Sequence, residues 1–289
     1  MFASLGRQLR CLVNGPANTQ RMGYLSIARI AALGCLLAAC AAPLTDTIAQ
    51  RLDVLLPAEL ILLGEQHDAA DHHRLEYALV LELANRRQLG ALVMEMVEQG
   101  RSTADLARDA SEADTQSALQ WDEASWPWKD YGPVVMAAVQ NGVPVLGANL
   151  PRTAMRTAMA NETLDDRLSP ERLARQRQAI RSGHCMMLPE SQIAPMTRIQ
   201  IARDAAMADT LVGARQSGKT VVLVAGAAHV SRSLGVPLHL PASIDVKVVR
   251  LSAGLTEPSV PTEGSDQDVI WETARMEPRD HCAEFKQRM

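Results

Sequence analysis

The chain has 289 residues, a formal net charge of −4 and a hydrophobic fraction of 47%, which is enough apolar material for one sizeable α/β domain. Its acidic balance argues against nucleic acid, or an anionic membrane surface, as a partner. Aromatic residues make up only 3% of the chain, so any cluster of them is informative.

The amino-terminal segment has the pattern of a bacterial lipoprotein signal. Residues 1–39 contain four arginines and no acidic residue, and the apolar stretch 25–40 is too short to span a bilayer as a helix. The stretch ends in Leu-Ala-Ala-Cys, which resembles a lipobox and predicts lipid, including palmitate, on Cys40. The alternative is an ordinary cleaved signal with an incidental cysteine. Both Met1 and Met22 fit as the start.

Removal of residues 1–39 would leave 250 residues and lower the net charge from −4 to −8, because four arginines leave with no acid. Alanine after Cys40, rather than aspartate, suggests the outer membrane, with the domain facing the periplasm. We therefore expect the following organisation: a signal peptide at 1–39, a lipid-anchored tether at 40–57, an α/β domain at 58–255 with a helical insertion at 152–218, and a carboxy-terminal extension at 256–289.

Two cysteines remain in the predicted mature chain, Cys185 and Cys282. A compartment outside the cytoplasm permits a disulfide between them. Each follows a histidine (His184 and His281), so a metal site of two histidines and two cysteines is an alternative, although dipeptides lack the usual zinc-site spacing. Two unpaired thiols are the third interpretation.

Short apolar runs alternate with helical patterns along most of the chain, which predicts an α/β fold with a mostly parallel central sheet, flanking helices and a helical insertion. The first helix is expected over 68–88 with Asp68 as its cap. The last strand alternates in polarity and is expected at a sheet edge, followed by an extended tail over 256–280. The expected strands are 59–64, 91–96, 143–149, 220–225 and 245–251.

Polar side chains follow the inner strands: Glu65 with His67, then Glu95, Asn149 and His229. The carboxyl ends of parallel strands meet at one edge of a sheet, where ligands bind. Carboxylates and imidazoles suit a divalent transition metal, and bound metal can generate hydroxide for hydrolysis. The set Glu65, His67, Glu95 and His229 is therefore a candidate metal or catalytic site, with hydrogen-bonded structural residues as the alternative.

Three further features have two interpretations each. Four aromatic residues within 121–131 are either a packed loop or a wall for a flat ligand. The Met-rich helices of 152–218 are either core packing or a lid over a hydrophobic ligand. His72 and Glu76 share one helix face at i, i+4, where a solvated contact is the simpler interpretation.

The segments LLGEQHDAADHHRLE, VMEM, GHCMMLP with a following QIARD, and AGAAHVSRSLGVP resemble the ChaN-like haem-binding lipoproteins over about residues 50–255. That family is related to Tiki metal-dependent proteases, TraB-type proteins and erythromycin esterase-like enzymes. The resemblance implies an α/β fold with a helical insertion, haem binding linked to iron uptake, a homodimer with haem between subunits, and an outer-membrane haem or iron receptor as a partner.

The chain has no CxxCH, so haem would be bound non-covalently. It also lacks HExxH and GxSxG. The resemblance leaves a metal-dependent hydrolase as the alternative function, since related enzymes use the positions of Glu65, His67, Glu95 and His229 for metal or as a base. The candidate haem ligands are His67, His72, His73, Tyr77, His184 and His229.

Overall fold

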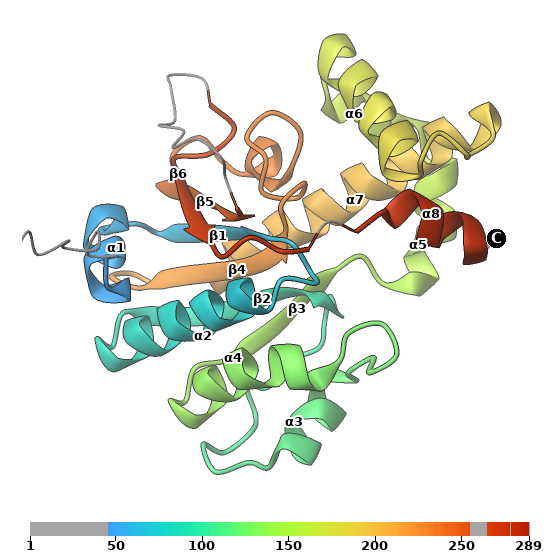
Figure 1. Cartoon of the computed structure of the whole chain (residues 1–289). Coiled ribbons are helices and arrows are strands. Elements are labelled where there is room, and N and C mark those ends of the chain that lie inside the picture. The colour runs from blue at the N-terminus through green and yellow to red at the C-terminus, as the bar shows by residue number, and fades with distance from the viewer. Residues whose placement is uncertain (1–45, 255–264, 278, 289) are drawn as a thin grey trace, which may run out of the picture. The chain divides into compact units, whose positions relative to one another are not determined.

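The computed structural model describes residues 46–254, 265–277 and 279–288 (Figure 1). The predicted signal peptide, both candidate start residues and Cys40 lie outside these residues, as does the segment 255–264 of the predicted tail. Within the described residues, no helix is both long and apolar enough to cross a membrane.

A six-stranded sheet forms the centre of the fold, with the order β3-β2-β4-β1-β5-β6 and every pairing between named strands parallel. The α/β prediction is confirmed. The strands read as continuous apolar runs because helices cover both faces of the sheet. Their bounds are β1 Leu60–Glu65, β2 Leu89–Glu98, β3 Val145–Asn149, β4 Thr220–Gly226, β5 Val246–Ala253 and β6 Val269–Thr273.

Helices lie on both sides of this sheet (Figure 1). One face packs against α1 (Ile48–Leu55), α2 (Ala70–Asn85) and α4 (Trp128–Gln140), with α3 (Glu112–Leu119) beside α4. The carboxy-terminal half of α7 (Glu190–Ala214) covers the other face through Met207, Ala208 and Leu211. The strands therefore deliver their carboxyl ends to an edge framed by α2, α4 and α7.

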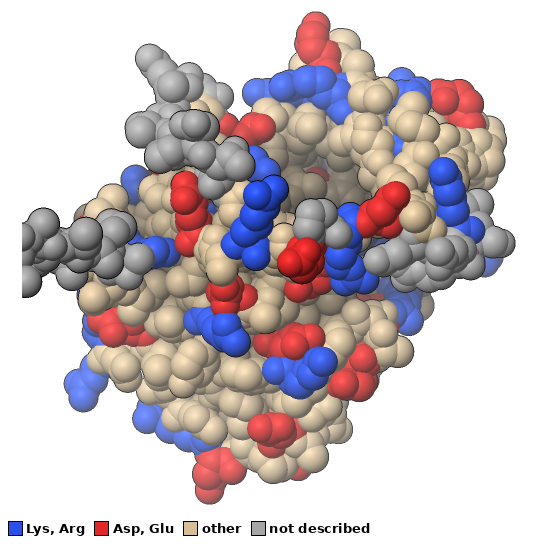
Figure 2. All heavy atoms as spheres, in the orientation of Figure 1, with Lys and Arg blue, Asp and Glu red and all other residues tan. Residues whose placement is uncertain are grey.

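The predicted helical insertion comprises α5 (Arg152–Ala160), the 3-10 helix η1 (Glu162–Arg167), α6 (Pro170–Gly183) and α7. It has a small core of its own, in which Ala158, Leu164 and Leu168 pack on Ile201 and Ala202. Figure 2 shows a hollow over α7, between α6 and the loops that follow β4, on a face where acidic and basic side chains are intermixed. These loops contain the short helix η2 (Val236–His239).

Three expectations about particular elements need correction. β5 is not an edge strand, because β6, from the predicted extended tail, pairs with it and takes the edge. Residues 48–55 of the predicted tether form α1, which is capped by Thr47 and buries Leu52 and Leu55 in the core. Asp68 does not cap α2, which begins after Ala69 without a side-chain cap; Asp68 pairs instead with Arg279.

Candidate functional site

Three adjacent strands, β2, β4 and β1, bring the predicted polar residues together. Glu65 ends β1 level with Gly226 of β4, and His229 lies on the turn three residues beyond it. Glu95 lies on β2, on the other side of β4, and its Oε2 accepts a hydrogen bond from the Gly226 amide at 2.7 Å. The parallel register is therefore what gathers side chains that are up to 164 positions apart in the chain.

Glu65 is the centre of the half of the site that faces α2 and α4. Its Oε1 accepts a hydrogen bond from the Tyr131 hydroxyl at 2.8 Å and lies 2.8 Å from Nδ1 of His67. Its Oε2 lies 3.2 Å from Nε2 of His73. Burial alone would raise the pKa of Glu65, but the two neighbouring imidazoles outweigh it and hold that pKa well below its ordinary value. Glu65 is therefore a buried anion.

His229 is the centre of the other half, which faces α7. Its Nδ1 lies 2.5 Å from Oδ1 of Asp204, and its Nε2 lies 3.3 Å from Oε1 of Glu95. Burial alone would lower the pKa of His229, but the two carboxylates raise it to about 10. Burial would likewise raise the pKa of Glu95, whereas the charge on His229 lowers it to about 2. An imidazolium between two acids is thus the stable form of this half.

Burial also raises the pKa of Asp204 to about 6, in spite of the neighbouring imidazole. The Gln200 side chain completes the surroundings of His229, with its Nε2 atom 3.1 Å from Nδ1 of the histidine. Gln200 and Asp204 lie on α7, one helical turn apart, and both face the strand ends.

His67 joins the two halves. It is bonded to Glu65 through Nδ1, and its Nε2 lies 3.9 Å from Oε2 of Glu95. Glycine at position 226 permits this approach, because a Cβ there would lie 2.8 Å from His67 Nε2. Burial alone would lower the pKa of His67, but the two glutamates raise it. Its side chain keeps 39% of its surface exposed, so the cluster reaches solvent through this ring.

Trp126 forms one side of this opening, with its ring centroid 4.9 Å from that of His67. Its neighbours in the aromatic cluster, Trp121, Trp128 and Tyr131, pack on one another edge-on or tilted. Trp128 and Tyr131 belong to the core. The cluster is therefore a packed unit that also presents one ring to the site.

His72, His73 and Glu76 turn inward from the first turns of α2. His72 and Glu76 are both 0% exposed, so the interpretation of this pair as a solvated contact is wrong. Nδ1 of His72 accepts a hydrogen bond from the Gln66 amide at 2.9 Å, and burial lowers the pKa of His72, which keeps it neutral. Burial and the adjacent charge of Glu65 raise the pKa of Glu76 well above its ordinary value.

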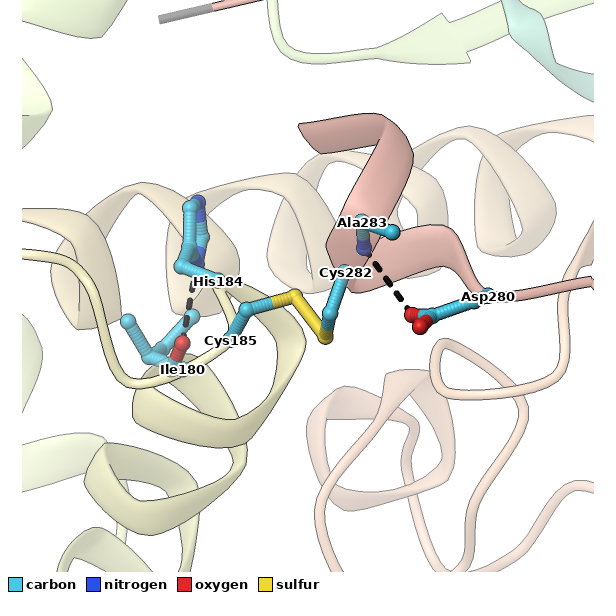
Figure 3. The surroundings of a disulfide bond; sticks show 6 residues. All are labelled: Ile180, His184, Cys185, Asp280, Cys282 and Ala283. Atoms are coloured by element: carbon cyan, nitrogen blue, oxygen red, sulfur yellow. Dashed lines mark hydrogen bonds between the residues drawn. A yellow bond between two sulfur atoms is a disulfide. The ribbon is translucent and has the colours of Figure 1, made fainter. Parts of the chain in front are cut away.

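The remaining predicted residues lie away from the cluster. Tyr77 is on the outer side of α2 and is 39% exposed. His184 follows α6, where its Nδ1 lies 2.8 Å from the Ile180 carbonyl oxygen, and the next residue, Cys185, is joined to Cys282 in a disulfide with a Cα–Cα distance of 5.5 Å (Figure 3). With both sulfurs bonded, neither is left for the alternative metal site.

The sequence placed Trp126 and Tyr131 in the aromatic cluster and Gln200 and Asp204 in the QIARD segment, but none of the four was predicted as a site residue. For Asp204 a signal exists in the helical periodicity. The residue lies among Ile201, Ala205 and Ala208 on the apolar side of α7, and a carboxylate at a core position needs a partner. Tyr131 carries no comparable signal, since a tyrosine in an aromatic cluster is adequately explained by packing.

The fold and the site together define an α/β protein with a helical insertion and a buried cluster of carboxylates and imidazoles at the ends of its central strands. The chain belongs to the family described as "Haem-binding uptake, Tiki superfamily, ChaN", whose model matches residues 52–240. The resemblance inferred from the motifs is therefore confirmed. No curated protein matches the chain.

Among solved structures, ChaN of Campylobacter jejuni, described as a structure of cofacial haem binding, is similar over 78% of this chain and 91% of its own. The two share 26% identity, with a TM-score of 0.63. An erythromycin esterase matches 78% of this chain and 79% of its own at 14% identity, with a TM-score of 0.43. That second likeness is distant.

The charge on His229 makes stability depend on pH. Its pKa of about 10 exceeds its ordinary value of 6.5, so its stabilising effect is complete below pH 6.5 and is lost as the pH rises through 10. We expect the free energy of unfolding to fall between these limits, by up to about 1.4 kcal/mol per pH unit. Urea denaturation from pH 6.5 to 9 measures the slope. His229→Gln should flatten it, and equal slopes in both proteins would contradict the assignment.

Proposed function

We propose that this chain is a periplasm-facing lipoprotein that binds haem non-covalently and acts in haem or iron uptake or handling. Membership of a haem-binding family, with a match over residues 52–240 that includes β1 to β4 and the helical insertion, is the observation that carries the proposal. The similarity to a ChaN structure described as haem-bound supports it.

Burial separates the six candidate haem ligands. His72, His73 and His229 are at most 8% exposed, so a flat macrocycle reaches none of them without opening the fold. His67 is partly exposed, but its two ring nitrogens face Glu65 and Glu95. His184 is half-buried at the end of α6. Tyr77 is 39% exposed, and tyrosinate is among the ligands that haem iron accepts.

The surroundings of Tyr77 fit a haem. Tyr77 lines a hollow of about 320 Å³ between α2 and α4, whose other lining residues are Ala70, His73, Arg74, Lys129, Asp130 and Pro133. Tyrosinate is an established haem ligand, Ala70 and Pro133 offer apolar surface, and Arg74 and Lys129 can pair with the propionates. Haem supplies an iron centre when bound; the chain's own residues supply the ligand and the opposite charges.

A shallow hollow on one surface covers only one face of a haem. A second copy of the chain would cover the other face, so we extend the proposal to the homodimer that the family resemblance implies. This arrangement agrees with the cofacial binding described for the Campylobacter jejuni protein.

Replacing Tyr77 tests the ligand. We expect haem to give the full chain a saturable Soret change and a phenolate-to-iron charge-transfer band. Tyr77→Phe removes the phenol oxygen but keeps the ring, so the band should vanish and the affinity should fall by at least about tenfold. The matched control is Glu82→Gln, which lies on the same helix outside the hollow.

A wild-type chain without a saturable spectral change would refute haem binding. Wild-type behaviour in Tyr77→Phe, combined with loss of binding in His67→Asn, would move the ligand to His67 while leaving haem binding intact.

Two features support a place in the cell envelope. The lipobox at Cys40 follows a basic, apolar leader, and Cys185 is joined to Cys282, a bond that persists in oxidising compartments (Figure 3). We propose that Cys40 carries the lipid and that the protein lies at the periplasmic side of the outer membrane, within reach of a haem or iron receptor there.

Replacing Cys40 tests the anchor. In a bacterial host, Cys40→Ser should abolish incorporation of labelled palmitate and move the protein from the membrane fraction to the soluble periplasmic fraction. Cys35→Ser, within the same leader, should leave both properties unchanged. Unlabelled, soluble wild-type protein would contradict a lipid anchor.

One observation favours a second function, hydrolysis. Glu65 holds Nδ1 of His67, and this ring is the part of the acid–imidazole cluster that is open to solvent, which is how a carboxylate orients a metal-ligating histidine. A divalent ion bound between His67, Glu95 and His229 would lower the pKa of the imidazoles and activate water.

We expect such an enzyme to hydrolyse p-nitrophenyl acetate only with added zinc or manganese. His67→Asn should slow this reaction by about 100-fold or more, because it removes a metal ligand. His281→Asn, an exposed histidine, is the control. Equal rates in wild type and His67→Asn would remove the hydrolase interpretation.

A further inference from the structure

A second group of ligand-type side chains lies beneath α2, on the opposite side of Glu65 from His67. It consists of Glu65, His73 and Glu76, which we call the α2 triad. One ligand atom from each residue lies within 4.8 Å of the other two. The three residues are 2%, 8% and 0% exposed, respectively. The strand-end cluster of Glu65, His67, Glu95 and His229 shares only Glu65 with this triad.

Hydrogen bonds among the described residues do not account for the triad. Neither carboxylate oxygen of Glu76 accepts a hydrogen bond from a donor in that part of the chain, and neither does Oε2 of Glu65. The contact of 3.2 Å between that oxygen and Nε2 of His73 lacks the alignment of a hydrogen bond. Buried polar atoms in folded proteins nearly always have partners, and two adjacent carboxyl groups without one are costly.

A single cation would provide a partner for all four atoms, namely Oε2 of Glu65, both carboxylate oxygens of Glu76 and Nε2 of His73. Ligands bound to one zinc ion at about 2.0–2.2 Å lie roughly 3 to 3.6 Å from each other, which matches the separation of Glu65 Oε2 and His73 Nε2. Tyr131 donates to Oε1 of Glu65, which fixes the carboxylate and directs Oε2 toward the triad. Glu76 lies on the next turn of α2 and offers an oxygen within 4.8 Å of the other two ligand atoms.

We propose that Glu65, His73 and Glu76 bind one divalent transition-metal ion between the end of β1 and the first turns of α2. Two carboxylates and one imidazole suit zinc, manganese or iron(II), and two negative charges balance the ion. His73 also lines the hollow between α2 and α4, which gives an ion a route from solvent. The proposal stands independently of haem binding.

The ion would have a structural and positioning role. It would join α2 to β1 near the start of the helix, where the N-cap residue Ala69 offers no side-chain hydrogen bond. It would also hold Glu65 in the orientation that presents Oε1 to His67. The rival explanation for two adjacent buried carboxyl groups is a single proton shared by Glu65 and Glu76, and this explanation requires no metal.

Metal analysis of the full chain, purified without chelator and then loaded with zinc, tests the proposal. We expect one zinc ion per chain at this site, and a melting temperature about 5–10 °C higher when zinc exceeds its dissociation constant 100-fold. X-ray absorption at the zinc edge should count one imidazole, from His73. The strand-end cluster would supply two imidazoles, from His67 and His229.

Two substitutions make the test specific. Glu76→Gln keeps the shape but removes a ligand, so zinc affinity should fall by more than about 100-fold and the thermal shift should be lost. Glu82→Gln, also on α2 and in contact with Arg86, is the matched control and should bind zinc as the wild type does. Should Glu76→Gln fail to fold, the imidazole count on the wild type still decides between the two sites.

Three results would overturn the proposal. The first is a wild-type chain that binds no zinc, manganese or cobalt. The second is a bound zinc with two imidazole ligands. The third is a Glu76→Gln protein that is as stable as the wild type and binds zinc equally well, which would establish the shared proton. Haem titration of the same preparations reads out the proposed function separately.

Discussion

The need to neutralise four buried carboxyl groups is the constraint on which the rest of this structure depends. Glu65, Glu76, Glu95 and Asp204 are all at most 5% exposed, and they meet at one edge of the sheet. Isolated carboxylates in such a place would be far too costly. His229 lies between two of them, and His67 lies between Glu65 and Glu95. The imidazoles are therefore as much a part of the folded state as the apolar core.

The helix α2 separates two kinds of surface. Its inward side carries His72, His73 and Glu76, which are buried, although His73 also lines the hollow shared with α4. Its outward side carries Arg74 and Tyr77, which border the hollow shared with α4. A haem in the hollow and an ion in the α2 triad would therefore be neighbours, with His73 between them. Such an arrangement would give the buried acids of this chain a role that a haem pocket does not require.

The parallel sheet and the convergence of Glu65, Glu95 and His229 follow from the sequence, because apolar runs that end in polar residues determine both. Periodicity also places Glu76 on one side of α2 with His72, but it does not say which side meets the sheet. The positions of Tyr131 and Asp204 depend on how α4 and α7 pack, and packing is set by tertiary contacts rather than by local pattern. The strand β6 was missed because it is short and follows a polar segment.

The position of β4 has a consequence for the order in which the protein is assembled. This strand is late in the chain, yet it lies between β1 and β2, and these two strands have no direct pairing with each other. A chain that ended before residue 220 would lack the strand that bridges its two earliest strands. Glu65 and Glu95 would then lie on two strands that no third strand joins. The cluster therefore requires β4, and no amino-terminal half of the protein can carry it.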